Sequence, residues 1–200
     1  MAEKLTKEFA QKLMKIKGEC RGITLKVDWD YVLRKEGKEG LKRLEERLAE
    51  LGYPLKYKEI RSMDFYPIGL DALSMLVIKE LFHYNEKEIE RMGASAVKFS
   101  LILKIFLKYF GSLSMMIEEA PKVWNKHYTI GRLEASKIND KEGFLALKLF
   151  DFKVHPIFCI VFKGYFGQVG KMVLGKEVNC VERKCMFLGD PYHEFLLKWK

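Results

Sequence analysis

The chain has 200 residues, of which 48% are hydrophobic and 32% are charged. This composition is globular and excludes a disordered or collagen-like chain. The 36 Lys and Arg residues exceed the 27 Asp and Glu residues and give a net charge of +9. Because the excess is spread along the chain, the sequence lacks the localised basic patch that nucleic-acid binding requires, and we expect no nucleic-acid partner.

The N-terminus and the apolar segments predict a cytoplasmic protein. The opening MAEKLTKEF is too charged for a signal peptide. The longest apolar run, near residues 99–110, is interrupted by Lys104 and Lys108, so no stretch approaches the roughly 20 apolar residues that span a bilayer. In a cytoplasmic chain we expect the four cysteines to be free thiols.

Residues 1–125 are predicted to be mostly helical. Apolar residues at helical spacing, often followed by Gly or Pro, predict helices over residues 3–17, 28–35, 38–51, 69–83, 85–91, 96–110 and 113–124. Asn85 and Glu88 have the spacing of a capping box, and Gly93 is expected to end the helix that they begin. The helix over residues 96–110 is apolar on nearly all sides and is predicted to be central. Residues 55–60, which alternate weakly, could form an edge strand or an extended linker.

Residues 126–200 have a different pattern. Strands are predicted over residues 128–138, 144–152, 176–188 and 192–199, and a helix that begins at Pro156 separates the two pairs. The order strand, strand, helix, strand, strand predicts a four-stranded antiparallel sheet with a crossover helix. We therefore expect a single α/β (α+β) domain over residues 1–200, with the helical N-terminal half packed on this sheet.

No common catalytic motif occurs in the sequence. There is no Walker A loop, no dinucleotide-binding glycine fingerprint, no H-E-x-x-H and no G-x-S-x-G. Gly164, Gly167 and Gly170 repeat every third residue inside the predicted crossover helix, where a phosphate loop would not lie. We interpret them as sites of close helix–sheet packing, and we expect binding rather than catalysis.

Cys185 and His193 flank the turn of the last predicted hairpin. A hairpin that closes near Asp190 and Pro191 would bring these side chains within about 5 Å of each other. A thiolate and an imidazole would supply half of a tetrahedral zinc site. Cys180 lies an odd number of residues from Cys185 and should face the other side of the sheet, so we interpret Cys180, like Cys20, as structural.

The segment over residues 182–195 resembles the closing hairpin of the 4-vinyl-reductase domain family. The family pattern is Glu-x-x-Cys, three residues, Gly-Asp, and then a second Cys before an acidic or polar residue and Phe. Here Glu182, Cys185, Gly189 and Asp190 match, and His193 stands where the family has its second cysteine. The resemblance covers about residues 125–200. It implies a sensor or carrier pocket in a fold shared with TRAPP vesicle-tethering subunits.

The resemblance also implies a zinc ion held by a glutamate, a crossover-helix cysteine and the hairpin pair. By position, Cys159 is the helix cysteine and Cys185 and His193 are the pair. Glu134 is the nearest candidate carboxylate, although its spacing from Cys159 differs from that in the family. Each residue has an ordinary alternative. The cysteines could be small buried residues, His193 a hydrogen-bonded strand residue, and Glu134 a solvated side chain.

The large flexible and aromatic side chains suit a pocket for an apolar ligand, although an ordinary core would also use them. The chain has 14 Phe, 9 Tyr and 9 Met residues. Those expected to converge between the central and crossover helices are Phe106, Met115, Met116, Tyr128, Phe158, Phe162 and Phe166. Tyr128 or His155 would supply a polar anchor.

Our main hypothesis is a non-enzymatic sensor or carrier domain that binds an apolar or aromatic small molecule in a buried pocket, with a structural zinc beside it. Exposed strand edges favour a homodimer. One alternative is a tetrapyrrole- or haem-related binding protein or enzyme accessory, in which His83, His127 or His155 ligates iron or protonates a substrate. The other alternative is a protein–protein interaction module of the vesicle-tethering type.

Overall fold

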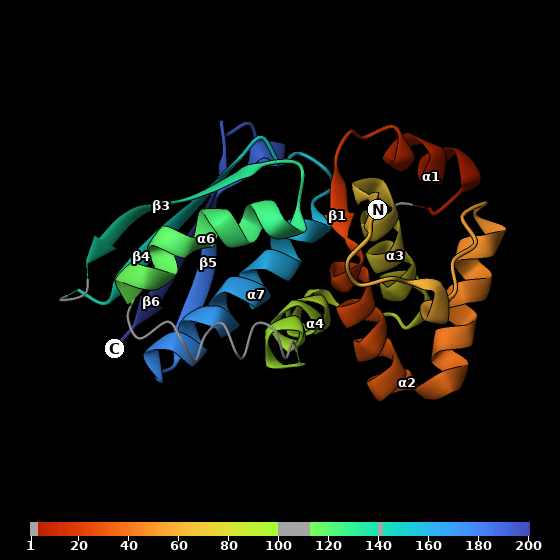
Figure 1. Cartoon of the computed structure of the whole chain (residues 1–200), viewed down its shortest axis with the longest axis horizontal. Coiled ribbons are helices and arrows are strands. Elements are labelled where there is room, and N and C mark those ends of the chain that lie inside the picture. Colours follow the sequence, from red (N-terminus) through yellow and green to blue (C-terminus); the bar gives the residue numbers. More distant parts are fainter. Residues whose placement is uncertain (1–3, 100–112, 140–141) are drawn as a thin grey trace.

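The computed structural model describes residues 4–99, 113–139 and 142–200. It consists of a helical half, residues 4–99, beside a half that contains the main sheet, residues 113–200 (Figure 1). The helical half contains α1 (Lys7–Met14), β1 (Glu19–Arg21), α2 (Gly22–Glu50), the 3-10 turn η1 (Tyr57–Glu59), β2 (Phe65–Pro67), α3 (Ile68–Leu81) and α4 (Glu86–Phe99). The sheet half contains α6 (Leu113–His127), β3 (Arg132–Asn139), β4 (Phe144–Phe150), α7 (Ile157–Leu174), β5 (Val178–Lys184), the 3-10 turn η2 (Met186–Leu188) and β6 (His193–Trp199).

The main sheet confirms the predicted architecture. Its four strands are all antiparallel in the order β3-β4-β6-β5, and α7 is the crossover helix between β4 and β5. Helices α6 and α7 cover one face of this sheet, and α4 packs against α7 from the side of the helical half (Figure 1). The helical and sheet halves therefore meet along α4, α6 and α7.

The helical half differs from the prediction at several boundaries. The element α2 contains both of the helices expected over residues 28–35 and 38–51. Its first segment begins earlier than expected, at Gly22, and the two segments meet at Gly37, where the backbone is not helical and φ is 73°. The structure contains the capping box, since Asn85 and Glu88 exchange side-chain-to-backbone hydrogen bonds of 3.1 and 3.2 Å. Residues 100–110 of the expected central helix lie outside the described part of the chain.

Gly93 does not end its helix, as the sequence suggested; α4 continues to Phe99. Gly93 lies so close to α7 that an added Cβ would overlap the carbonyl oxygen of Val161, and Gly164 of α7 faces the carbonyl oxygen of Glu90 in the same way. The predicted close packing at Gly164 is thus between two helices. Further along α7, Gly167 and Gly170 face β5 and β6 side chains, as expected.

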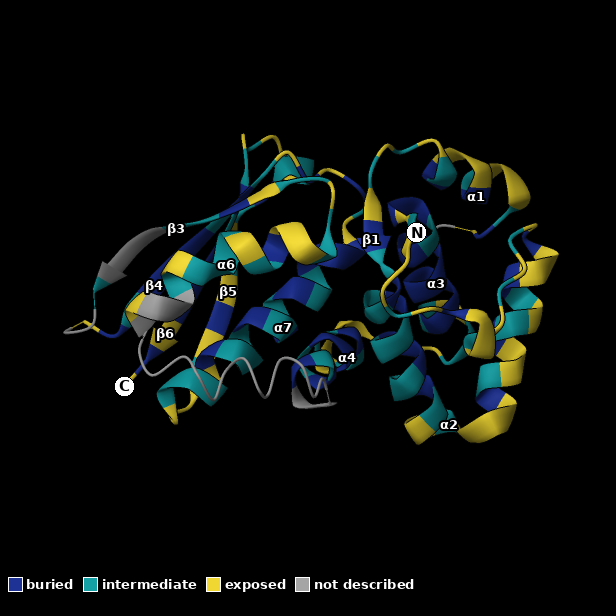
Figure 2. Cartoon of the chain, in the orientation of Figure 1, coloured by how far each residue is buried: buried dark blue, intermediate teal, exposed yellow. Residues whose placement is uncertain are grey.

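Residues 55–60 contain the turn η1 rather than a strand, and the short pair β1–β2 was not predicted. Its strands have three residues each, which is too short for a periodic pattern. Buried residues run through both halves, and α3 is buried along most of its length (Figure 2). Across this core the indole N–H of Trp29 donates to the Ser74 hydroxyl at 2.7 Å, joining α2 to α3.

By length and composition, α7 could cross a membrane, which the sequence analysis did not anticipate. In the structure it packs against α4, β5 and β6, and 39% of its residues are buried. A core helix of a globular protein passes the same test of length and hydropathy, and the packing of α7 is that of a core helix.

Candidate functional site

Four side chains that can bind a metal meet beside the N-terminal end of α7. They are Cys159, Glu182, Cys185 and His193, and their ligand atoms all lie within 4.8 Å of one another. The two sulfur atoms are 3.8 Å apart, and Sγ of Cys159 is 3.7 Å from Nδ1 of His193. Two sulfurs bound tetrahedrally to zinc at about 2.3 Å lie about 3.8 Å from each other. The separation of the two sulfur atoms in this metal cluster therefore matches that in a tetrahedral zinc site.

The β5–β6 hairpin brings three of these side chains together through two local irregularities. Glu182 and Cys185 are three residues apart, so on a regular strand their side chains would face opposite sides of the sheet. A register shift between Glu182 and Lys184 bends the end of β5 and allows both side chains to reach the same cluster. The chain then turns through η2, where the Asp190 carboxylate accepts a 2.8 Å hydrogen bond from the backbone N–H of Cys185. His193 follows as the first residue of β6.

The imidazole of His193 is held in an orientation that suits a ligand. Its Nε2 lies 3.0 Å from the carbonyl oxygen of Phe152, which can only accept a hydrogen bond, so Nε2 carries a proton and donates it. Nδ1 faces Glu182 at 2.9 Å and the sulfur of Cys159. A hydrogen bond from the second nitrogen to a backbone carbonyl is the usual way in which proteins orient a metal-ligating histidine.

The protonation of the Cys159 thiol would depend on whether a metal is bound. Burial, and then the charge of Glu182, raise the pKa of this thiol above the ordinary value. Cys159 also lies in the first turn of the 18-residue helix α7, whose dipole favours negative charge at that end. A metal ion would replace the thiol proton, so metal binding there would release protons.

Glu134, the carboxylate selected from the sequence, takes no part in this cluster. It lies on β3, pairs with Arg132 and faces Lys148 across the β3–β4 ladder. Glu182 occupies the carboxylate position instead. Glu182 begins the Glu-x-x-Cys spacing noted in the sequence, which was the signal that could have identified it.

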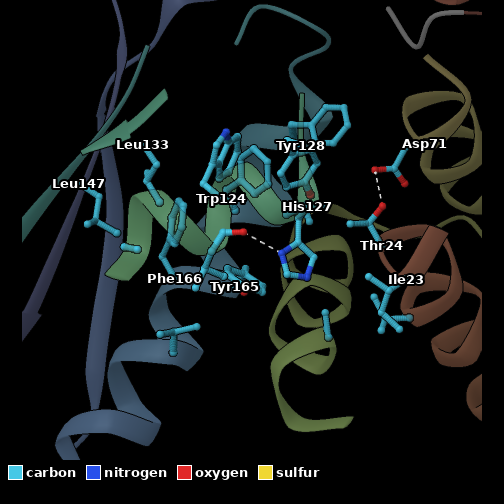
Figure 3. Close-up of a pocket in the computed structure, with 18 of the residues that line it drawn as sticks. Ile23, Thr24, Asp71, Trp124, His127, Tyr128, Leu133, Leu147, Tyr165 and Phe166 are labelled. Atoms are coloured by element: carbon cyan, nitrogen blue, oxygen red, sulfur yellow. Dashed lines mark hydrogen bonds between the residues drawn. The ribbon is translucent and has the colours of Figure 1, made fainter. Parts of the chain in front are cut away.

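A second site, which we call the central chamber, lies between the two halves of the fold (Figure 3). It has a volume of about 160 Å³ and is lined by α2, α3, α4, α6, α7 and the sheet. Its aromatic lining consists of Trp124, Tyr128, Phe158, Phe162, Tyr165 and Phe166. The rings of Trp124 and Tyr128 are stacked with their centroids 4.4 Å apart.

Four of the predicted pocket residues, Tyr128, Phe158, Phe162 and Phe166, therefore line one chamber. Phe106 lies outside the described residues, and the side chains of Met115 and Met116 in α6 are also outside them. His155 is not an anchor for this chamber. Its ring packs edge-on against Phe9, and its Nδ1 accepts a hydrogen bond from the backbone of Ile157.

The lining also contains polar groups. Tyr128 and His127 were both predicted, Tyr128 as an anchor and His127 as a ligand in the haem-related alternative, whereas Thr24, Asp28 and Asp71 were not predicted. Burial, and then the neighbouring Asp71 charge, raise the pKa of Asp28, while burial raises the pKa of Asp71 to about 7. A carboxylate inside the otherwise apolar stretch of residues 68–78 was the signal that could have identified Asp71.

His127 lies on the α6 side of the chamber. Its Nδ1 is 2.9 Å from the carbonyl oxygen of Val123, and burial lowers its pKa, so that the neutral imidazole is favoured. Figure 3 shows Thr24 and Asp71 on the α2 and α3 side, across from Leu133 and Leu147. The chamber is thus apolar next to the sheet and acidic next to the helical half.

Three solved structures show what this fold is similar to. An H-NOX protein from S. oneidensis in the Fe(II)NO ligation state superposes with a TM-score of 0.65 at 15% identity over 90% of this chain and 99% of that one. An unliganded Fe(II) H-NOX protein from K. algicida gives 0.65 at 11%, over 90% and 96%. An oxygen-binding H-NOX domain related to soluble guanylate cyclases gives 0.60 at 13%, over 86% and 92%. No family model and no curated protein matches the sequence.

These structures correct the resemblance drawn from the hairpin motif. The fold is that of H-NOX proteins, and the assignment to the 4-vinyl-reductase family and its vesicle-tethering relatives is wrong. A motif of four residues is short enough to recur in an unrelated hairpin, whereas the fold similarity covers most of the chain. The assignment of Cys159, Glu182, Cys185 and His193 as a metal site therefore rests on their geometry alone and not on the family resemblance.

Proposed function

We propose that this chain is a non-enzymatic sensor domain that binds a small molecule in the central chamber. The chamber itself is the observation that carries the proposal, because it is apolar and lies where the two halves of the fold meet. A ligand there would contact α2 and α3 on one side and α6 and α7 on the other. A ligand shifts a conformational equilibrium when it binds one conformation more tightly than another, and a ligand that contacts both halves would bind most tightly to one arrangement of them.

The structural comparisons favour the haem-related alternative over an apolar or aromatic ligand. The similar proteins are described as an Fe(II)NO state, an unliganded Fe(II) state and an oxygen complex, and iron held by a histidine is what the haem-related alternative expects. Of the three histidines proposed as ligands, His127 lines the chamber. With Nδ1 donating to the Val123 carbonyl, Nε2 would be the iron-binding atom.

The rest of the described lining does not fit a haem. A haem carries two propionate groups, whereas the described lining contains Asp28 and Asp71 and no Lys or Arg. The volume of about 160 Å³ is close to the roughly 150 Å³ of a cavity that holds benzene. Pockets for drug-sized ligands start at about 300 Å³. The chamber volume and lining therefore favour a compound with a single ring.

Titration of the purified chain with haemin and, separately, with toluene distinguishes the two ligands. A one-to-one haem complex should show a Soret band that weakens in His127→Ala and persists in the control His155→Ala. Binding of toluene by calorimetry, without a haem complex, would favour the single-ring ligand. If neither haemin nor any single-ring compound binds, the proposed function is wrong.

We also propose that the metal cluster holds a structural zinc. Two thiolates, an imidazole and a carboxylate form a donor set that zinc prefers, and the two sulfur atoms lie at a tetrahedral separation. The ion would fasten the start of α7 to the β5–β6 hairpin. Phe158, the residue before Cys159, lines the chamber, so the zinc would also support the chamber wall.

A further inference from the structure

The wall of the central chamber formed by α2 and α3 contains a carboxylate oxygen without a partner. Asp71 is only 2% exposed, and its Oδ1 has no hydrogen-bond partner among the described residues. The Thr24 hydroxyl lies 3.4 Å from Oδ2 and also 2.8 Å from the Arg21 carbonyl oxygen, and the Cys20 thiol forms a hydrogen bond with the same carboxyl group. An unpaired buried carboxyl oxygen destabilises the fold unless another group binds it.

A second buried carboxyl group stands beside it. Asp28 is 6% exposed, lines the same chamber and interacts electrostatically with Asp71. The described lining contains no Lys or Arg that could neutralise either group. In its ionised form, either carboxyl group would create a negative potential in this low-dielectric chamber, and a ligand of opposite charge would compensate it.

We propose that the chamber binds a small organic amine, with its apolar body against the aromatic side chains and its ammonium group against Asp71 and Asp28. This inference rests on the proposed function and names the ligand class for the same site. An ammonium group has three N–H donors and no acceptor, so it can pair with Oδ1 of Asp71 and compensate its charge.

The neighbouring groups favour an amine over a neutral or an anionic ligand. A hydroxyl compound would donate one hydrogen bond but leave the carboxylate charge uncompensated, and an anion would be repelled. Asp71 faces Asp28, Cys20, Thr24 and Tyr128, none of which is cationic. Because burial raises the pKa of Asp71 to about 7, its proton can be exchanged for an ammonium ion near neutral pH.

Three ligands with the same ring test the proposal by isothermal titration calorimetry on the full chain at about pH 7. Benzylamine, benzyl alcohol and toluene differ in the head group alone. We expect benzylamine to bind the wild-type chain at least about tenfold more tightly than benzyl alcohol. In Asp71→Asn this preference should disappear. The control Asp64→Asn removes one exposed negative charge and should keep the preference.

The outcomes separate this inference from the proposed function. If benzyl alcohol or toluene binds the wild-type chain as tightly as benzylamine, the amine proposal is wrong and the single-ring chamber stands. The same amine preference in Asp71→Asn would also overturn the proposal. If none of the three compounds binds, the chamber is not a site for single-ring ligands. The wild-type comparison decides the question even if Asp71→Asn fails to fold.

Discussion

The sulfur atoms of Cys159 and Cys185 lie 3.8 Å apart, although 26 residues separate the two cysteines in the chain. One sulfur comes from the first turn of α7 and the other from the residue that follows β5. The two free thiols thus bring the start of the crossover helix into contact with the end of the edge strand β5. Because α7 also supplies Phe158 and Phe162 to the central chamber, the metal cluster and the chamber share one rigid element.

The first prediction concerns the metal. The purified chain should contain about one zinc per molecule after dialysis against a mild chelator, measured by elemental analysis. Glu182→Gln should lower zinc affinity by at least roughly 10- to 100-fold, the loss seen when only a hydrogen-bond partner of a metal ligand is removed. Cys185→Ser should lower it further.

Glu134→Gln and Cys180→Ser are the matched controls, because neither residue belongs to the cluster. Both should retain full zinc content. A zinc-free wild-type chain, or equal zinc loss in Glu134→Gln and Glu182→Gln, would contradict the assignment of the ligands.

The second prediction concerns the pH dependence of stability. Asp71 has a folded-state pKa of about 7, above its ordinary value of 3.8, because it is buried. The folded chain therefore holds this proton more tightly than the unfolded chain. The stability that this provides is full below about pH 4 and is lost as the pH rises through about 7, a loss of a few kcal/mol.

Urea unfolding at a series of pH values measures this effect. Asp71→Asn should flatten the fall in stability between about pH 4 and pH 7, and it should be more stable than the wild-type chain at about pH 8. Asp64→Asn, which changes an exposed carboxylate, should keep the wild-type slope. Parallel curves for the wild-type chain and Asp71→Asn would show that Asp71 titrates normally.

The third prediction concerns the crossing of α4 and α7. Gly93→Ala and Gly164→Ala would each place a Cβ on a carbonyl oxygen of the facing helix, so the helices would have to separate. We expect each to lower the free energy of unfolding by roughly 1–3 kcal/mol in urea titrations.

Gly167→Ala in the same helix is the control. Its Cβ would meet the nearest atom, Cβ of Cys180, at 3.3 Å, which a small shift relieves. Alanine also favours helix formation by about 1 kcal/mol relative to glycine. Gly167→Ala should therefore leave the free energy of unfolding nearly unchanged. If Gly164→Ala were equally stable, the close packing of α4 against α7 at Gly164 would be contradicted.

The fourth prediction concerns occupancy of the chamber. Ala120 lies in α6 and lines the chamber, so Ala120→Phe would place a ring in a space of about 160 Å³. The affinity for toluene or benzylamine, measured by calorimetry, should fall by about tenfold or more because the ring competes for the same volume. Ala49→Phe, on the exposed face of α2, should bind as the wild-type chain does. Undiminished binding to Ala120→Phe would place the ligand elsewhere.

The sequence by itself determined the order of the strands in the main sheet half and the antiparallel sheet with its crossover helix. Apolar spacing, turn residues and capping residues are local signals. The structure confirms one of them directly, because Asn85 and Glu88 form the predicted capping box. The same local reasoning predicted proximity for Cys185 and His193, because both flank one hairpin turn.

Only the tertiary structure decided the rest of the two sites. Glu182 replaces Glu134 because a register shift re-aims a side chain, and no pattern of apolar residues encodes such a shift. Gly93 lies inside a helix rather than at its end. A glycine is required there because the backbone of α7 at Val161, distant in sequence, packs directly against it. Asp28 and Asp71 come from helices whose positions are set by packing across the whole core, and a one-dimensional pattern does not contain that packing.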